Sequence, residues 1–280
     1  MSFPRIIARL DIKGPNLVKG IHLEGLRVLG SPSQFANKYF LDGADELFYQ
    51  DVVASLYNRN SILEFIQDTA KRISIPLTVG GGIREINDIS NALEAGADKV
   101  AINTAAINNP NIIKEASRIF GSSTIVGTIE TIESDNKTYL AYTDNGREYT
   151  GIDIFEWCKK LEDLGAGEIM ITSIDRDGTG VGCDTNLIKK IRDLISVPLI
   201  AHGGVGMSKH IEQAISSGAN AVAIASIIHY GALIKNEFID NKSIEGNKNF
   251  ISNFKKFKSF GPNDLKKIKK ELKDIVSIRD

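Results

Sequence analysis

Short apolar runs alternate with stretches of helical periodicity along most of the chain. The apolar runs predict eight strands, at 5–11, 46–51, 76–80, 99–103, 124–130, 168–173, 198–202 and 221–225. Apolar residues at helical spacing predict seven helices, at 33–41, 60–73, 86–95, 111–119, 154–164, 185–194 and 208–217. Glycine-containing phrases end three of these helices and lead straight into strands, because glycine supplies the left-handed cap.

This alternation predicts an α/β fold, a TIM (β/α)8 barrel over residues 1–234. An open doubly wound sheet is the alternative. Residues 136–150 predict a small hairpin inserted after the fifth strand. The Lys-rich segment 235–280 predicts a C-terminal helical extension, which we interpret mainly as a solvated terminus.

Two segments from opposite halves of the chain repeat each other. Residues 77–106 and 199–228 align without a gap, so that Gly82 coincides with Gly204 and Thr104 with Ser226. Each copy has a strand, a glycine loop, a helix ending at Gly-Ala and a second strand. The repeat predicts two half-barrels, each with a phosphate nest, because backbone N–H groups at glycine turns and helix starts bind anions.

Strand parity predicts which side chains point into the barrel. Asp11, Asn103 and Glu130 fall at carboxyl ends of strands, where barrels do chemistry. The pair of carboxyl groups there suits general acid–base catalysis. The opposite end carries two cations and two carboxylates, Arg5, Glu46, Lys99 and Glu168. This neutral floor ring is equally well interpreted as a structural salt-bridge plug or as a polar gate.

The composition argues against several classes of function but does not identify one. The chain has 280 residues, 42% of them hydrophobic and 25% charged, with a net charge of −1. We therefore expect no general attraction to nucleic acid or membranes. Cys158 and Cys183 fit no metal-ligand spacing and favour a reducing compartment. We expect a cytoplasmic protein without a signal peptide, a membrane span, a metal or another cofactor.

Several phrases together resemble the cyclase subunit of imidazole glycerol phosphate synthase. They are RIIARLDIK, LVKGIHLEGLR, GADELFYQDVVAS, LTVGGGI, GADKVAINTAA, GAGEIMITSIDRDGTGVGCDT and the AHGG turn, and they span about 1–230. The resemblance implies a TIM barrel with two-fold symmetry. It also implies a glutaminase partner at the barrel floor, whose ammonia passes a charged gate to a bisphosphorylated substrate at the mouth.

The resemblance also implies roles for individual residues. The resemblance implies that the floor ring is the ammonia gate. It also implies that Asp11 is a catalytic acid–base residue and that Glu130 stands at the position of the second catalytic carboxylate. Lys19 on the first loop contacts the substrate, and Asp51 and Asp177 lie on the rim. The resemblance implies that one phosphate group of the substrate binds to Gly82, Asn103 and Thr104. The other phosphate group binds to Gly178, Gly203, Gly204, Ala225 and Ser226.

Three residues depart from the family pattern, all at the chemical end. The family has Asp where this chain has Glu130, a small residue where it has Arg9, and Ser where it has His202. Parity aims Arg9 at the carboxyl groups, where it pairs with Glu130 or with Asp11. His202 is either a packed polar residue at a strand end or a contact to a changed ligand.

These departures resemble a paralogous branch found with surface-polysaccharide genes. The branch is associated with acetamidino sugars and works with a glutaminase and a sugar amidotransferase. We favour this branch as the function. The alternatives are the histidine-pathway cyclase, which makes imidazole glycerol phosphate and a carboxamide ribotide (AICAR), and a non-catalytic scaffold that activates the glutaminase and conducts ammonia.

Overall fold

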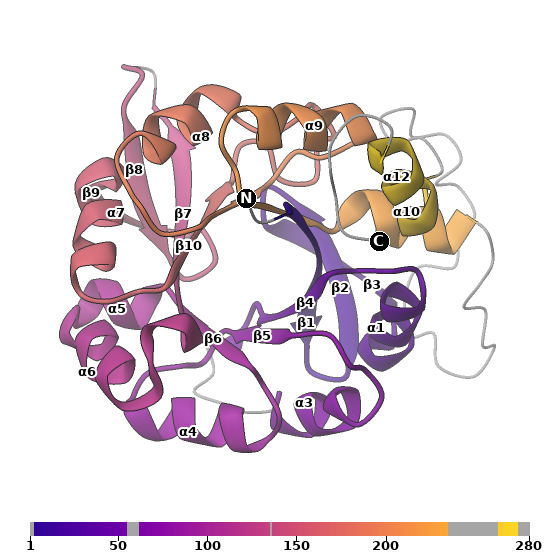
Figure 1. The fold of residues 1–280 in the computed structure, drawn as a ribbon, viewed down its shortest axis with the longest axis horizontal. Coiled ribbons are helices and arrows are strands. Elements are labelled where there is room, and N and C mark those ends of the chain that lie inside the picture. The colour runs from indigo at the N-terminus through magenta and orange to yellow at the C-terminus, as the bar shows by residue number, and fades with distance from the viewer. Residues whose placement is uncertain (1–2, 55–61, 135, 235–262, 274–280) are drawn as a thin grey trace.

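Eight parallel strands close into a barrel. The computed structural model describes residues 3–54, 62–134, 136–234 and 263–273. Within them the barrel strands are β1 (Arg5–Lys13), β4 (Glu46–Asp51), β5 (Leu77–Gly80), β6 (Lys99–Ile102), β7 (Ile125–Glu133), β10 (Glu168–Ser173), β11 (Leu199–His202) and β12 (Ala221–Ile224). They pair in that order, and β12 pairs with β1 to complete the ring (Figure 1). The predicted TIM barrel is confirmed.

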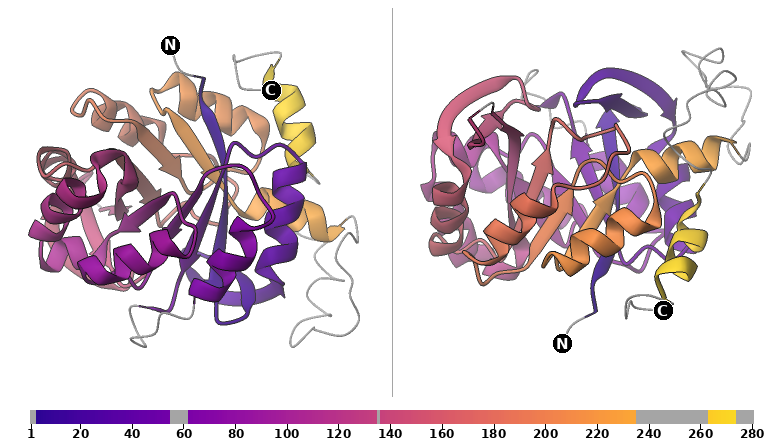
Figure 2. Two further views of the ribbon diagram at one scale, coloured as in Figure 1. Left: turned by 60° about the horizontal axis from the view of Figure 1, so that its bottom comes forward. Right: turned by 90° about the horizontal axis from the view of Figure 1, so that it is seen from above.

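Helices surround this ring (Figure 2), and their buried apolar residues join the core against the sheet. They are α1 (Pro32–Leu41), α3 (Leu63–Ala70), α4 (Ile86–Glu94), α5 (Thr104–Asn108), α6 (Asn111–Phe120), α7 (Ile154–Asp163), α8 (Thr185–Arg192), α9 (Ser208–Ser216), α10 (Ser226–Ile234) and α12 (Leu265–Lys273), with the short 3₁₀ turn η1 (Ser122–Thr124). All seven predicted helices have a counterpart, although the start of the one expected at 60–73 lies outside the described residues. None of the described helices combines the length and the apolar character that crossing a membrane requires.

The internal repeat has a direct structural counterpart. The elements β5, α4, β6 and α5 begin at residues 77, 86, 99 and 104, and β11, α9, β12 and α10 begin at 199, 208, 221 and 226. Each element of the second unit thus begins 122 residues after its counterpart. The two units place their glycine loops at the same level of the barrel.

Two antiparallel hairpins extend from the barrel mouth. The predicted insertion is confirmed as β8 (Tyr139–Thr143) paired with β9 (Glu148–Asp153), which follows β7. The segment expected as a first loop forms a second hairpin, β2 (Asn16–Ile21) and β3 (Glu24–Gly30), which continues from β1. Lys19 therefore lies on a strand rather than in an irregular loop.

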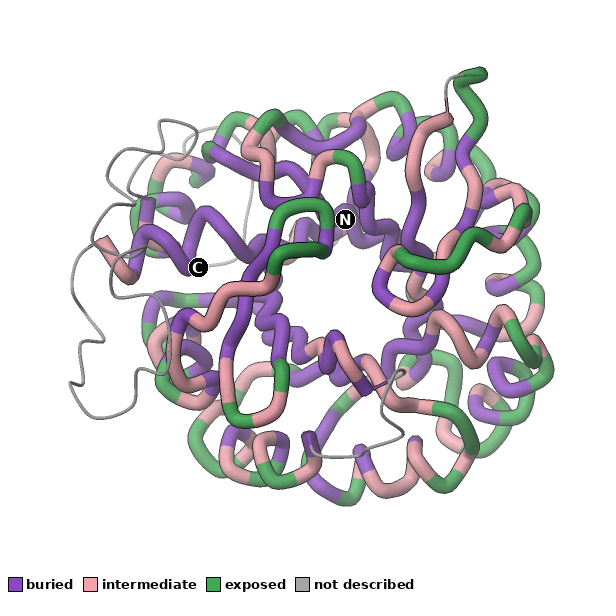
Figure 3. The backbone as a smooth tube through the Cα atoms, turned by 180° about the vertical axis from the view of Figure 1, so that it is seen from behind, coloured by how far each residue is buried: buried purple, intermediate pink, exposed green. Residues whose placement is uncertain are grey.

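An apolar layer fills the middle of the barrel, and Figure 3 shows the wall around it as mostly buried. Its members come from seven strands: Ile7, Phe48, Ala101, Val126, Met170, Ile200, Ala221 and Ala223. Ile7 lies between Arg5 and Arg9 on the inward face of β1, as parity predicts. The layer separates the charged residues of the floor from those of the mouth.

The Lys-rich tail contains a helix that packs on the barrel. Leu265, Ile268 and Leu272 of α12 are fully buried, and α12 lies against α9. Lys269 Nζ lies 2.8 Å from Asp45 Oδ1 at the barrel floor. This helix is therefore part of the barrel's outer layer and not a solvated extension; residues 235–262 and 274–280 of the tail lie outside the described residues.

Replacing Ile268 by alanine tests how far α12 supports the fold. Because Ile268 is fully buried, Ile268→Ala should lower the free energy of unfolding by about 2–5 kcal/mol. Lys267→Ala, on the exposed side of the same helix, should change it by about 0.5 kcal/mol or less. Urea unfolding measures both, and equal effects of the two variants would contradict the packing described here.

Candidate functional site

The four residues of the floor ring form one closed network of ion pairs. Arg5 Nη1 lies 2.7 Å from Glu46 Oε2 and 3.0 Å from Glu168 Oε1. Lys99 Nζ lies 3.2 Å from Glu46 Oε2 and 3.1 Å from Glu168 Oε1. Each cation thus contacts both carboxylates. The sequence analysis missed Thr78, whose hydroxyl donates to Glu46 Oε1 at 2.6 Å and further fixes the buried carboxylate.

A second charged cluster fills the barrel mouth around Arg9. The Arg9 Nε donates to Asp11 Oδ1 at 2.9 Å, so the structure selects Asp11 as its ion-pair partner over Glu130. Arg9 Nη1 lies 3.4 Å from Thr172 Oγ1 and 3.3 Å from His202 Nδ1. The guanidinium also lies over the Phe48 ring, 5.7 Å from its centroid. Both Arg9 and Asp11 are buried.

Lys19 joins this cluster from the hairpin β2–β3. Its ammonium lies 2.6 Å from Asp177 Oδ2 and 3.5 Å from Asp11 Oδ2, and the side chain is only 1% exposed. His202 Nε2 lies 3.7 Å from Asp177 Oδ1. Burial and the charges of Arg9 and Lys19 hold the pKa of His202 well below its usual range, so this contact is between a neutral ring and a carboxylate. The expected substrate-contacting lysine is therefore paired with protein carboxylates in this structure.

Glu130 lies apart from these ion pairs. Its Oε2 accepts a hydrogen bond of 2.8 Å from the backbone N–H of Gly146, on the hairpin β8–β9. Burial raises the pKa of Glu130 to about 7, against the opposing charge of Arg9. For Asp11, burial acts in the same direction, but the neighbouring Arg9 and Lys19 charges prevail and lower its pKa. The two carboxyl groups therefore differ in protonation near neutral pH.

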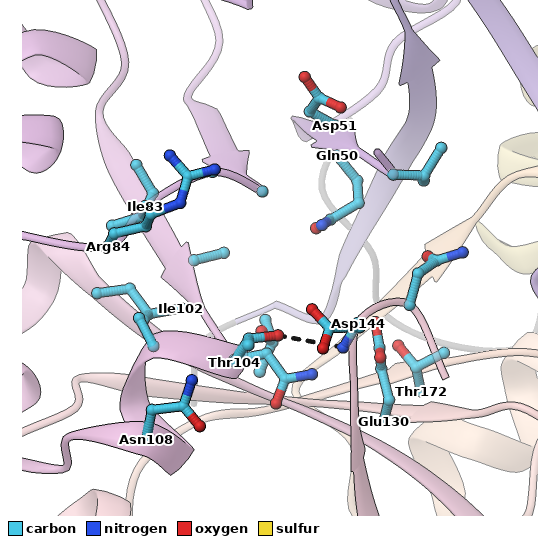
Figure 4. A pocket seen from close by; sticks show the side chains of 18 of the residues that line it. Gln50, Asp51, Ile83, Arg84, Ile102, Thr104, Asn108, Glu130, Asp144 and Thr172 are labelled. Carbon is cyan, nitrogen blue, oxygen red and sulfur yellow. Dashed lines mark hydrogen bonds between the residues drawn. The ribbon is translucent and has the colours of Figure 1, made fainter. Parts of the chain in front are cut away.

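The first predicted phosphate nest opens onto a pocket of about 420 Å³. Gly82, Asn103 and Thr104 line it together with Asp51, Glu130 and Arg9. Figure 4 shows Glu130 and Thr172 close together in this pocket, across from Gln50 and Asp51. At Gly81, where φ is +88°, an added Cβ would collide with the Asp51 carbonyl group, so only glycine allows this turn. We call the part of this pocket formed by Gly81, Gly82, Asn103 and Thr104 the first cradle.

The second predicted nest has much less free space than the first. Its residues surround a cavity of only about 10 Å³: Asp177, Gly178, His202, Gly203, Gly204, Ala225 and Ser226 are among them. The hairpin β2–β3 packs against it, because the backbone N–H of His22 donates to the Asp177 carbonyl at 2.8 Å. A Cβ on Gly178 would lie 2.6 Å from the Gly20 carbonyl oxygen. We call the part formed by Gly178, Gly203, Gly204, Ala225 and Ser226 the second cradle.

The turn of the hairpin β8–β9 is the part of the site that sequence reasoning missed. The Asp144 N–H donates to Thr104 Oγ1 at 3.2 Å, and Asn103 Nδ2 donates to the Tyr142 carbonyl at 3.1 Å. With the Gly146 contact to Glu130, the turn touches both the first cradle and a candidate catalytic residue. The available signal was its position directly after the strand that carries Glu130.

The fold places the chain among the (β/α)8 barrels, with charged clusters at both ends of the barrel interior. A family described as "Histidine biosynthesis protein" matches residues 5–234. The chain is 53% identical over 206 residues to an imidazole glycerol phosphate synthase subunit HisF from Legionella pneumophila, covering 74% of this chain and 97% of that relative. It is 44% identical over 234 residues to a subunit of the same name from Thermobifida fusca (strain YX), covering 82% and 91%. The chain belongs to this family, which confirms the resemblance at the level of the cyclase family.

The raised pKa of Glu130 predicts a pH-dependent stability difference. Between about pH 4.5 and its folded-state pKa of about 7, the folded protein holds a proton on Glu130 that the unfolded chain releases. The contribution of Glu130 to the free energy of unfolding therefore falls as the pH rises through that window. Glu130→Gln should gain on the order of 2–3 kcal/mol relative to the original protein between about pH 5 and pH 8.

Denaturant unfolding at a series of pH values measures this difference. Glu148→Gln, which removes an exposed carboxylate from the neighbouring hairpin, is the matched control. A constant difference between Glu130→Gln and the original protein across the series would show that Glu130 titrates in the same range folded and unfolded.

Proposed function

We propose that this protein is the cyclase subunit of an imidazole glycerol phosphate synthase. In this proposal it receives ammonia from a glutaminase docked at the barrel floor and uses it on a phosphorylated substrate at the mouth. The family membership supports the histidine-biosynthesis activity more directly than the sugar pathway favoured by the sequence departures. The sugar pathway and the sugar amidotransferase partner stay predictions.

The observation that carries the proposal is the pair of unlike carboxyl groups at the barrel mouth, of which Glu130 lines the pocket of the first cradle and Asp11 contacts its neighbour Arg9. Asp11 is held ionised by Arg9 and Lys19, and the ionised form is the one that can accept a proton as a general base. Glu130 has a pKa of about 7 and so supplies a proton near neutral pH, which suits a general acid. Attack of ammonia on a substrate and closure of a ring require both proton removal and proton donation.

The floor ring supports an ammonia entrance in this proposal. It retains the four residue types expected of the gate, and its members are unequally buried. Glu46 is 1% exposed, whereas the side chains of Arg5 and Lys99 are 25% and 16% exposed. Glu168 is 12% exposed, close to the value for Lys99, so Glu46 is the fixed member of the ring and the two cations are the most exposed members, able to swing aside. Above them the apolar layer would pass neutral ammonia more readily than ammonium.

A second candidate function has one specific observation in its favour. The three departures from the family pattern all lie at the mouth: Arg9 contacts both Asp11 and His202, and Glu130 lines the same pocket as Arg9. A changed substrate, such as the precursor of an acetamidino sugar, would account for changes confined to this end. A scaffold that only conducts ammonia would not need the two carboxyl groups to differ in protonation.

Turnover of the histidine-pathway bisphosphate with high ammonium, without a glutaminase, tests the proposal. The purified protein should form imidazole glycerol phosphate, and Asp11→Asn should lower kcat by about 10²–10⁴-fold. Asp163→Asn, at an exposed position on α7, is the control. Absence of turnover in folded protein and also in Glu130→Asp would reject the histidine reading in favour of a changed substrate or a conduit.

Lys99→Ala tests the gate separately from the chemistry. With the glutaminase present, the variant should lose more of its glutamine-dependent rate than of its rate on added ammonium, because only the first route uses the floor. Lys114→Ala, on the exposed surface of α6, should leave both rates unchanged. Equal losses of rate with glutamine and with added ammonium would show that the floor ring has a purely structural role.

A further inference from the structure

Arg9 has hydrogen-bonding capacity that the protein does not use. A guanidinium carries five N–H donors. The Nε donor goes to Asp11 at 2.9 Å, and Nη1 makes two longer contacts, 3.4 Å to Thr172 and 3.3 Å to His202. Among the described residues Nη2 has no hydrogen-bond partner, although it is buried. Buried donors of a charged group are costly to leave unpaired, so their presence at a pocket points to a ligand.

The position of Arg9 places this unused donor beside the candidate site. Arg9 lines the same pocket as the first cradle and Glu130, and its side chain is only 3% exposed. The ion pair with Asp11 and the contact with the Phe48 ring fix the guanidinium plane. A ligand anchored by a phosphate in the first cradle would therefore meet a rigid donor and not a flexible surface side chain.

The charges around Arg9 indicate what kind of acceptor fits. Arg9 and Lys19 contribute two positive charges, and Asp11 and Asp177 two negative charges, in contacts of 2.6–3.5 Å. This buried cluster is thus already neutral. A carboxylate beside Nη2 would add an uncompensated negative charge, whereas a carbonyl oxygen would accept the hydrogen bond without adding charge.

We propose that Nη2 of Arg9 donates to an uncharged carbonyl oxygen of the substrate, of the amide kind, and that Arg9 thereby determines substrate specificity. The inference rests on the proposed function, because it assumes that a phosphorylated substrate occupies the first cradle. Arg9 would select substrates that carry a carbonyl group at a fixed distance from a phosphate. Phosphorylated compounds with only alkyl carbons at that distance would leave the donor unpaired and bind more weakly.

Matched phosphorylated probes test the selection without needing the true substrate. The probes are the O-phosphates of 4-hydroxybutanamide, 5-hydroxypentanamide and 6-hydroxyhexanamide, the corresponding carboxylic acids, and alkyl phosphates of the same lengths. The three lengths allow for the reach between cradle and guanidinium. Calorimetry should show one amide binding about tenfold more tightly than its alkyl counterpart, the effect of one hydrogen bond to a charged donor. The same amide should also bind more tightly than its acid.

The variant pair Asp11→Asn and Arg9→Met/Asp11→Asn separates recognition from structural support. The single variant keeps the guanidinium and should keep the preference of amide over alkyl phosphate. The double variant removes both buried charges together, so no carboxylate is left unpaired, and should bind amide and alkyl phosphates equally. Unchanged alkyl phosphate affinity and a cooperative thermal transition would show that the first cradle is intact.

Two outcomes would overturn the inference: no amide preference in the original protein, or a preference that persists in the double variant. A preference for the acid over the amide would overturn the argument from the neutral cluster. The binding experiment uses neither ammonia nor turnover. Failure of the proposed function therefore appears as missing cyclase turnover with the amide preference retained, and failure of this inference appears as turnover without the preference.

Discussion

Every strand of the closed sheet sends alternate side chains into the barrel, and the filling of this confined space constrains the rest of the structure. Along β1 the inward residues are Arg5, Ile7, Arg9 and Asp11. Ile7 belongs to an apolar layer in the middle of the barrel, between the charged residues of the floor and those of the mouth. Charges on either side of such a layer must be neutralised within their own level, because an unpaired buried ion is strongly destabilising. The floor ring and the mouth cluster are two separate solutions to this requirement.

At the barrel mouth, the ion pairs that neutralise the buried charges are arranged around Arg9. An arginine inside the barrel needs a counter-ion, and Asp11 lies two residues further along the same inward face, where the side chain of Arg9 reaches it directly. Glu130 accepts a hydrogen bond from the Gly146 backbone N–H, and burial raises its pKa against the opposing charge of Arg9. Arg9 and Lys19 together therefore keep Asp11 ionised, whereas burial makes Glu130 the protonatable carboxyl group. The longer side chain of Glu130 is compatible with this separation, since it is held by the hairpin and not by the cluster.

The sequence was most informative where local periodicity decides the structure. Period-two alternation placed the floor ring and both carboxyl groups correctly, and the repeat located both cradles. The helix α10 was missed because SIIHYGALI is apolar all round and has no amphipathic stripe. In α12 the signal was present, since Leu265, Ile268 and Leu272 recur at helical spacing, but the surrounding lysines suggested a solvated segment. The alternation of side chains on β1 brought Asp11 within reach of Arg9 but left Glu130 open as the other partner. The burial of Lys19 depends on its contact with Asp177, 158 residues further along the chain, which no local pattern encodes.

The two cradles are equivalent in sequence but not in structure. The hairpin β2–β3 covers the second cradle and carries Lys19, which contacts both Asp177 and Asp11. The hairpin backbone contacts this end at two points: the His22 N–H donates to the Asp177 carbonyl, and a Cβ on Gly178 would lie 2.6 Å from the Gly20 carbonyl oxygen. Moving Lys19 away from Asp11 would remove one of the two cations that keep this carboxylate ionised.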